Sequence, residues 1–136
     1  MKKVITFGVY DYFHLGHLRL YKQCKEYGDY LIVAVQEGDY ILKYKPEAKV
    51  LYTTEQRIEM VSSQRVVDEV ITYQVISPEF LSKIDFDVLA LGEDHTADRW
   101  MKSAEWCLAN GKEVVRLKRT AGICSSDIKK SLSELK

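Results

Sequence analysis

Short apolar segments with strand character alternate with helical patterns along the chain, and this alternation constrains the fold more than any other feature. The segments are rich in β-branched and aromatic residues, as strands are. The predicted strands are 3–9, 30–36, 66–72, 86–91 and 113–117. The second of them is apolar almost throughout, which is typical of a strand that is covered on both faces.

Helical patterns fill most of the intervals between these strands. The predicted helices are 16–27, 53–64, a short helix that starts at Ser77-Pro78, 98–109 and 125–135. Thr53-Thr54-Glu55-Gln56 fits a capping box, and Gly28 and Asn110-Gly111 follow the ends of two other helices. Residues 37–52 show no clean period and predict a long loop.

Strands that alternate with helices favour a parallel sheet with helices on both faces. We therefore expect an α/β fold, a Rossmann-like doubly wound parallel sheet of about five strands. The 136 residues are in the size range of one domain, so a single domain over 1–136 is predicted.

The charge balance excludes several classes of function. Lys plus Arg total 20 and Asp plus Glu total 20, so the formal net charge is zero. A neutral chain lacks the cationic excess that general nucleic-acid or anionic-membrane binding requires, so neither partner is expected. The first apolar run ends at Gly8, too early for a signal peptide or a membrane span, and the 3 cysteines are not closely paired. A cytoplasmic protein is predicted.

In a doubly wound fold, ligands bind outside the carboxyl ends of the strands, where the strand order reverses. After the first strand, His14 and His17 frame Gly16 at the expected start of a helix. At this spacing both rings face one side of the first turn. Free N–H groups and the helix dipole at that turn attract phosphate, glycine permits a close approach, and imidazoles can donate hydrogen bonds to phosphate oxygens.

Other interpretations of the two histidines are open. A metal site would need a third ligand, and none with fitting spacing is nearby in the sequence. Both histidines could also lie on the surface by coincidence. The sequence contains neither the Gly-x-Gly-x-x-Gly fingerprint of dehydrogenases nor a Walker-type phosphate loop.

Two motifs carry a resemblance to a known family. Gly8-Val9-Tyr10-Asp11 with His14-Leu15-Gly16-His17 resembles the first motif of the HxGH nucleotidyltransferase superfamily. Arg119-Thr120-Ala121-Gly122-Ile123-Cys124-Ser125-Ser126 resembles its second motif. The resemblance covers essentially the whole chain and is greatest to the glycerol-3-phosphate cytidylyltransferases.

This resemblance implies an enzyme that transfers CMP from CTP to a small phosphate monoester and releases pyrophosphate. The acceptor would be glycerol 3-phosphate or another small phosphorylated alcohol or amino compound, and the product a CDP-activated precursor for cell-wall or capsule polysaccharide. It also implies Mg²⁺, bound mainly through the triphosphate and not by side chains, and a homodimer. The alternatives are an ATP-dependent adenylyltransferase of the flavin-nucleotide type and a nucleotide-binding homologue without turnover.

The resemblance also assigns roles to residues. His14, His17 and Arg119 would be catalytic. The nucleotide would be contacted by Gly8, Val9, Tyr10, Asp11, Gly16, Lys43, Lys45, Gly92, Asp94, Thr120, Gly122, Ile123, Ser125 and Ser126. The acceptor phosphate would be bound by Arg57 and Arg65.

Each of the less specific assignments has a simpler alternative. The two lysines could belong to a solvated loop, Asp94 could form an Asx turn, and the two acceptor arginines could be surface charges. Val9 and Cys124 depart from the threonine and serine usual in the family, and His95 carries no assigned role.

Overall fold

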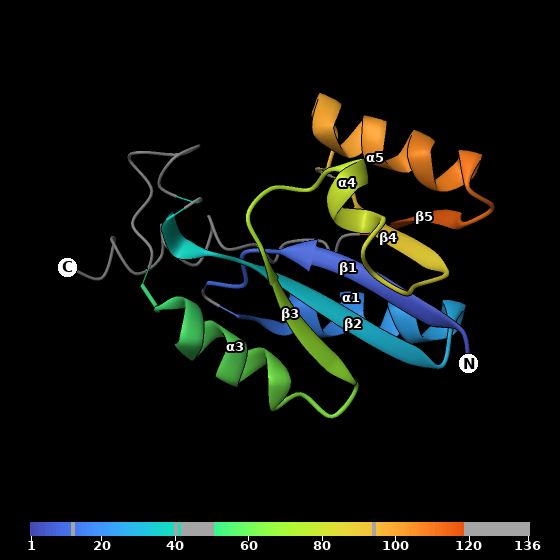
Figure 1. The fold of residues 1–136 in the computed structure, drawn as a ribbon. Helices are drawn as coiled ribbons and strands as arrows, with labels where there is room; N and C mark the ends of the chain where they lie inside the picture. Colours follow the sequence, from blue (N-terminus) through green and yellow to red (C-terminus); the bar gives the residue numbers. More distant parts are fainter. Residues whose placement is uncertain (12, 40, 42–50, 94, 119–136) are drawn as a thin grey trace.

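The computed structural model describes all residues except 12, 40, 42–50, 94 and 119–136 (Figure 1). The strands are β1 (Lys3–Gly8), β2 (Tyr30–Gln36), β3 (Glu69–Tyr73), β4 (Val88–Gly92) and β5 (Glu113–Leu117). The helices are α1 (Leu15–Tyr27), α3 (Thr54–Ser62), α4 (Pro78–Leu81) and α5 (Asp98–Ala109).

The strands form one parallel sheet in the order β3-β2-β1-β4-β5. The chain builds β2 and β3 outward from one side of β1, then returns to build β4 and β5 on the other side. Figure 1 shows α1 and α3 on one face of the sheet and α4 and α5 on the opposite face. The predicted Rossmann-like doubly wound fold is confirmed, and its order reverses between β1 and β4.

Alternate side chains of the strands fill two cores, as period-two strands covered on both faces require. One core joins the sheet to α1 and α3, and includes Tyr21, Cys24 and Val61. The other joins it to α4 and α5, and includes Leu81 and Trp100. Both cores flank β1, so the first strand is enclosed on its two faces and both edges.

The sequence signals at the helix ends are confirmed. Thr53 caps α3 in the expected box with Gln56, each side chain accepting a hydrogen bond from the other's backbone N–H. Ser77 caps α4 before Pro78, and Gly111 follows α5 with a φ of 75°, a conformation that favours glycine.

Several predicted boundaries differ from the structure; for example, the fourth strand begins at Val88 and not at residue 86. The third strand begins at Glu69 and not at residue 66, because the Val67 N–H donates to the Gln64 carbonyl in a turn. The loop predicted over 37–52 begins with helical residues, and the Ile41 N–H donates to the Glu37 carbonyl at 3.2 Å. The helix predicted over 125–135 lies outside the described residues.

Gly28 follows α1 as predicted. It does not adopt the left-handed conformation that usually explains glycine at the end of a helix. Its φ is −172°, an extended conformation open to any residue. A Cβ at Gly28 would lie 2.6 Å from the Lys2 carbonyl oxygen and 2.8 Å from Val4 Cγ2. The glycine therefore permits a close approach of the α1–β2 turn to β1.

Within the part of the chain that the structure describes, no helix is both long and apolar enough to cross a membrane.

Candidate functional site

The two histidines form the start of α1 at the carboxyl end of β1. The His14 Nδ1 atom accepts from the Gly16 N–H at 3.0 Å, and the His17 Nδ1 atom accepts from the His14 N–H at 3.2 Å. These bonds make a reciprocal capping box in which imidazoles replace the usual hydroxyl and carboxamide groups. The two rings stack with centroids 3.9 Å apart and planes 22° apart.

This capping fixes which ring nitrogen carries the proton. A neutral imidazole has one N–H donor and one acceptor nitrogen, and in both rings Nδ1 is the acceptor. In its neutral form each ring would therefore carry its proton on Nε2, as an N–H donor of the kind that binds phosphate oxygens. The Gly16 N–H donates to His14, so it is not one of the unpaired N–H groups expected at this turn from the sequence.

Aromatic side chains pack against the His17 ring. This ring lies 5.2 Å from the Tyr10 ring in an edge-to-face contact and 5.3 Å from the Phe13 ring. Tyr10 in turn contacts Tyr21 of α1, at 5.5 Å between ring centroids. Burial raises the pKa of the Tyr10 hydroxyl well above its usual value, so this support is uncharged at every physiological pH.

The end of β1 is shaped by Gly8 and Tyr10. Tyr10 has a φ of 58°, and its ring folds back over Gly8, where a Cβ would lie 2.6 Å from the tyrosine Cζ. The Tyr10 side chain belongs to the core, so only its backbone can line a ligand site. Glycine at position 8 is thus what allows the ring to support His17.

Asp11 and Arg57 hold the chain around this turn. Asp11 is 6% exposed, and its carboxylate accepts from the Leu51 N–H at 2.7 Å and the Tyr52 N–H at 3.0 Å. Arg57 is 0% exposed and donates one of its hydrogen bonds to the Val9 carbonyl at 2.8 Å. Both side chains therefore serve the protein's own backbone in this structure.

The predicted acceptor contacts of the two arginines are not supported by their positions. Arg57 has no exposed surface through which a phosphate could reach it. Arg65 is exposed, but it lies in the turn that leads into β3, at the amino edge of the sheet. In a parallel sheet this edge is opposite to the carboxyl ends that carry His14 and His17, so the structure does not bring Arg65 together with them.

The turn after β4 lies beside the end of β1, at the point where the strand order reverses. The Gly92 N–H donates to His95 Nδ1 at 3.1 Å, and the His95 ring stacks on Trp100 at 4.0 Å. Arg116 of β5 donates to the carbonyls of Gly92 at 3.2 Å and His95 at 2.7 Å. Sequence reasoning gave His95 no role. Its position directly after a strand end was the signal that could have found it.

The structure brings together the predicted residues at the end of β1 and places Gly92 at the end of the neighbouring strand, β4. Other predicted contacts lie outside the described residues and stay predictions. They are Lys43, Lys45, Asp94, Arg119, Thr120, Gly122, Ile123, Ser125 and Ser126, together with Cys124.

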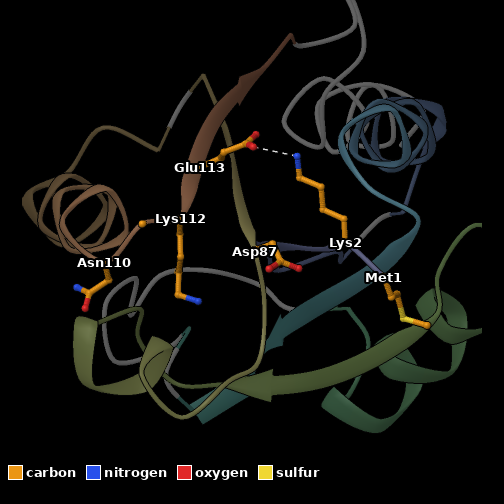
Figure 2. A pocket seen from close by; sticks show the side chains of 7 residues that line it. Met1, Lys2, Asp87, Asn110, Lys112 and Glu113 are labelled. Carbon is orange, nitrogen blue, oxygen red and sulfur yellow. Dashed lines mark hydrogen bonds and ion pairs between the residues drawn. The ribbon is translucent and has the colours of Figure 1, made fainter.

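An open pocket of about 560 Å³ lies at the opposite, amino edge of the sheet (Figure 2). Its charged side chains form ion pairs or hydrogen bonds with other groups of the protein. Lys2 pairs with Glu113 at 2.9 Å, Lys112 donates to the Phe86 carbonyl at 2.6 Å, and Asp87 accepts from the Lys3 N–H at 2.8 Å. This pocket is separate from the histidines and offers no converging reactive groups.

The described side chains do not form a metal cage. No group of three or more His, Cys, Asp or Glu residues converges on a common point within the described ranges. Asp11, the buried carboxylate at the carboxyl edge, accepts two backbone N–H groups.

The two described cysteines are poor nucleophiles, which yields a prediction. Burial raises the pKa of Cys24 to about 12 and that of Cys107 to about 11. Since the thiolate is the reactive species, we expect neither residue to be alkylated by iodoacetamide at pH 8 in the native protein. Peptide mass spectrometry should find both modified only after unfolding. Rapid native alkylation of Cys24 would contradict the burial of α1 against the sheet.

Comparison with known proteins adds independent information. A family model described as cytidylyltransferase-like matches residues 5–131. The glycerol-3-phosphate cytidylyltransferase of Staphylococcus aureus (strain NCTC 8325 / PS 47) is 39% identical over 97% of this chain and 96% of its own length. The FAD synthase of Ferroglobus placidus (strain DSM 10642 / AEDII12DO) is 36% identical over 93% of this chain and 84% of its own length.

A solved structure supports the fold. The lipopolysaccharide core biosynthesis protein from Thermoplasma volcanium GSS1 superimposes with a TM-score of 0.75, covering 88% of this chain and 98% of that protein at 24% sequence identity. At that identity the likeness concerns the fold alone.

Proposed function

Because the chain belongs to the cytidylyltransferase-like family and is a nucleotidyltransferase, we propose that it transfers CMP from CTP to glycerol 3-phosphate. The relative of that activity from Staphylococcus aureus aligns over nearly the whole of both chains. The observation that carries the proposal is the imidazole pair at the carboxyl end of β1, with both Nδ1 atoms used in capping.

In the proposed reaction, an oxygen of the acceptor phosphate attacks the α-phosphorus of CTP. A new P–O bond forms, the bond from the α-phosphorus to the oxygen bridging it to the β-phosphorus breaks, and pyrophosphate leaves with that oxygen. Little covalent chemistry is left for the protein, so it acts through position and charge stabilisation. The Nε2–H groups of His14 and His17 would donate to the phosphoryl oxygens on which negative charge develops.

Mg²⁺ would accompany the triphosphate in this proposal, bound mainly by phosphate oxygens, and would neutralise part of their charge. The described side chains fit this arrangement because they offer donors to phosphate and no competing acidic cage. Arg119, Lys43 and Lys45, which lie outside the described residues, are proposed to contribute further positive charge. We also propose that the protein is a homodimer and that its product is used for a cell-wall or capsule polymer.

The FAD synthase relatives favour one alternative, an adenylyltransferase that uses ATP and a flavin phosphate. Pyrophosphate release distinguishes the two when CTP and ATP are each combined with glycerol 3-phosphate and with FMN. We expect turnover with CTP and glycerol 3-phosphate. Turnover with ATP and FMN alone would establish the alternative. Binding of either nucleotide without pyrophosphate release from any pair would indicate a non-catalytic homologue.

A further inference from the structure

Arg57 is a charged side chain with no exposed surface at the carboxyl edge of the sheet. Burial lowers its pKa from the usual value, and the negative charge of Asp11 opposes that effect. An arginine stays protonated under such conditions, so the protein holds a full positive charge in its interior. An isolated buried charge is costly, and this cost is offset only where hydrogen bonds satisfy the group.

The guanidinium is satisfied by three separate segments of the chain. Its Nη1 atom donates to the Val9 carbonyl after β1 at 2.8 Å and to the Gln36 carbonyl at the end of β2 at 2.7 Å. Its Nε and Nη2 atoms donate to the Tyr52 carbonyl at 3.3 Å and to Thr54 Oγ1 at 3.2 Å, where α3 begins. One side chain thus joins the ends of two neighbouring strands to the helix that packs beside them.

Asp11 joins the segment after β1 to the segment before α3 through a second set of hydrogen bonds. It accepts the N–H groups of Leu51 and Tyr52, in the same segment whose Tyr52 carbonyl accepts from Arg57. The segment 9–11 is therefore held twice, once through the Val9 carbonyl and once through the Asp11 carboxylate. Only two residues separate Asp11 from His14, so this segment determines where α1 begins and where its two imidazoles lie.

We propose that Arg57 is a positioning residue for nucleotidyl transfer, which holds segment 9–11 and, through it, the imidazoles of His14 and His17 in reactive geometry. This inference rests on the proposed function and replaces the contact with the acceptor phosphate. Without the guanidinium, the carbonyl oxygens of Val9 and Gln36 would face each other without a donor. Each would then move toward water, and the turn that leads into α1 would move with Val9.

The test compares Arg57→Lys with the wild type in steady-state kinetics. Lysine keeps the charge, but its single nitrogen cannot reach carbonyls on all three segments. A displacement of about 1 Å at reacting groups can reduce the rate roughly 100-fold, so we expect kcat to fall about 10- to 100-fold. We expect KM for glycerol 3-phosphate to change less than about threefold, because removal of an interaction specific to the transition state leaves substrate binding intact.

The separate effects on kcat and KM distinguish a positioning role of Arg57 from direct binding of the acceptor. A tenfold rise in acceptor KM with unchanged kcat would mean that Arg57 binds the acceptor and would overturn the proposal. Unchanged kcat and KM in a folded Arg57→Lys protein would overturn it as well. Thr54→Val, which at constant shape removes the hydroxyl that accepts from the guanidinium and from the Gly38 N–H, should give a smaller loss of kcat in the same direction. It provides the test if Arg57→Lys does not fold.

Asp68→Asn is the matched control at the other edge of the sheet. The Asp68 carboxylate accepts from the Leu31 N–H at 2.8 Å and from Lys25 Nζ, and so joins α1, β2 and the chain entering β3. Its loss should lower thermal stability and leave kcat and KM unchanged. An equal loss of kcat in this control would mean that general destabilisation, and not position, explains the Arg57 result.

A spectroscopic measurement separates this inference from the proposed function. The carbon-bound ring protons of His14 and His17 should shift in the NMR spectrum of Arg57→Lys and stay unchanged in Asp68→Asn. This holds whichever nucleotide the wild type uses. A wild type inactive with both CTP and ATP would refute the proposed function, whereas unshifted histidine signals would refute the positioning role.

Discussion

Replacement of His17 by glutamine is expected to lower kcat about 100- to 1,000-fold, the loss typical when one donor to a developing oxyanion is removed. His17 has two tasks in this structure. Its Nδ1 atom caps α1, and its Nε2–H is the donor proposed for the phosphoryl oxygens. Glutamine at the third residue of a helix is a normal capping-box partner, so it preserves the first task and removes the imidazole. Pyrophosphate release and thermal unfolding, measured on the same preparation, distinguish the two.

His17→Ala is the companion variant. It removes the cap as well, so we expect the same loss of kcat together with a fall of about 1 kcal/mol in the free energy of unfolding. CTP affinity, measured separately by calorimetry, should change much less than kcat in both variants. A His17→Gln protein with wild-type kcat would show that the imidazole takes no part in the chemistry and would remove the basis of the proposed function.

The second large effect is on stability and involves Gly28. An alanine Cβ at this position would lie 2.6 Å from the Lys2 carbonyl oxygen. The contact is with backbone at the start of the central strand, which cannot move without disturbing the hydrogen bonds from the Asp29 and Tyr30 N–H groups to the same oxygen. We expect Gly28→Ala to lower the free energy of unfolding by about 3 kcal/mol. Denaturant unfolding followed by circular dichroism measures this difference.

Gly111→Ala is the control for this prediction. Gly111 has a φ of 75°, and a Cβ there would meet no atom of the described residues within 4 Å, so alanine introduces backbone strain without a clash. It should cost about 1 kcal/mol. Gly28 lies at the amino edge of the sheet, and Gly28→Ala should therefore keep wild-type kcat per folded molecule. If Gly28→Ala lowered the free energy of unfolding by less than Gly111→Ala does, this result would contradict the close approach of the turn to β1.

The sequence predicted most of the fold because its local signals agree with its packing. The apolar runs, the Thr53 and Ser77 caps and the glycine after α5 all identify elements that the structure contains. The start of β3 was mispredicted because valines 66 and 67 have a high preference for strands, while pairing with β2 begins only where Asp68 meets Leu31.

The site was only partly predictable. The histidine pair was visible because both residues belong to one helical turn. The burial of Arg57 was not visible, since arginine is mostly exposed in proteins and its partners are 21 and 48 residues away in the chain. His95 and Arg116 meet for a similar reason, as parts of neighbouring strand ends, and no local pattern marks such a pair.

The strand order has a consequence for the newly synthesised chain. Thr6 of β1 meets β2 at Val33, but on its other side it pairs with Ala90, 84 residues further along the chain. Folding during synthesis proceeds from the N-terminus, so β1, β2 and β3 can assemble while one edge of the central strand has no partner. Exposed apolar edges promote association between chains. Ribosome stalling or truncation before Val88 should therefore release fragments that aggregate, although they already contain both histidines.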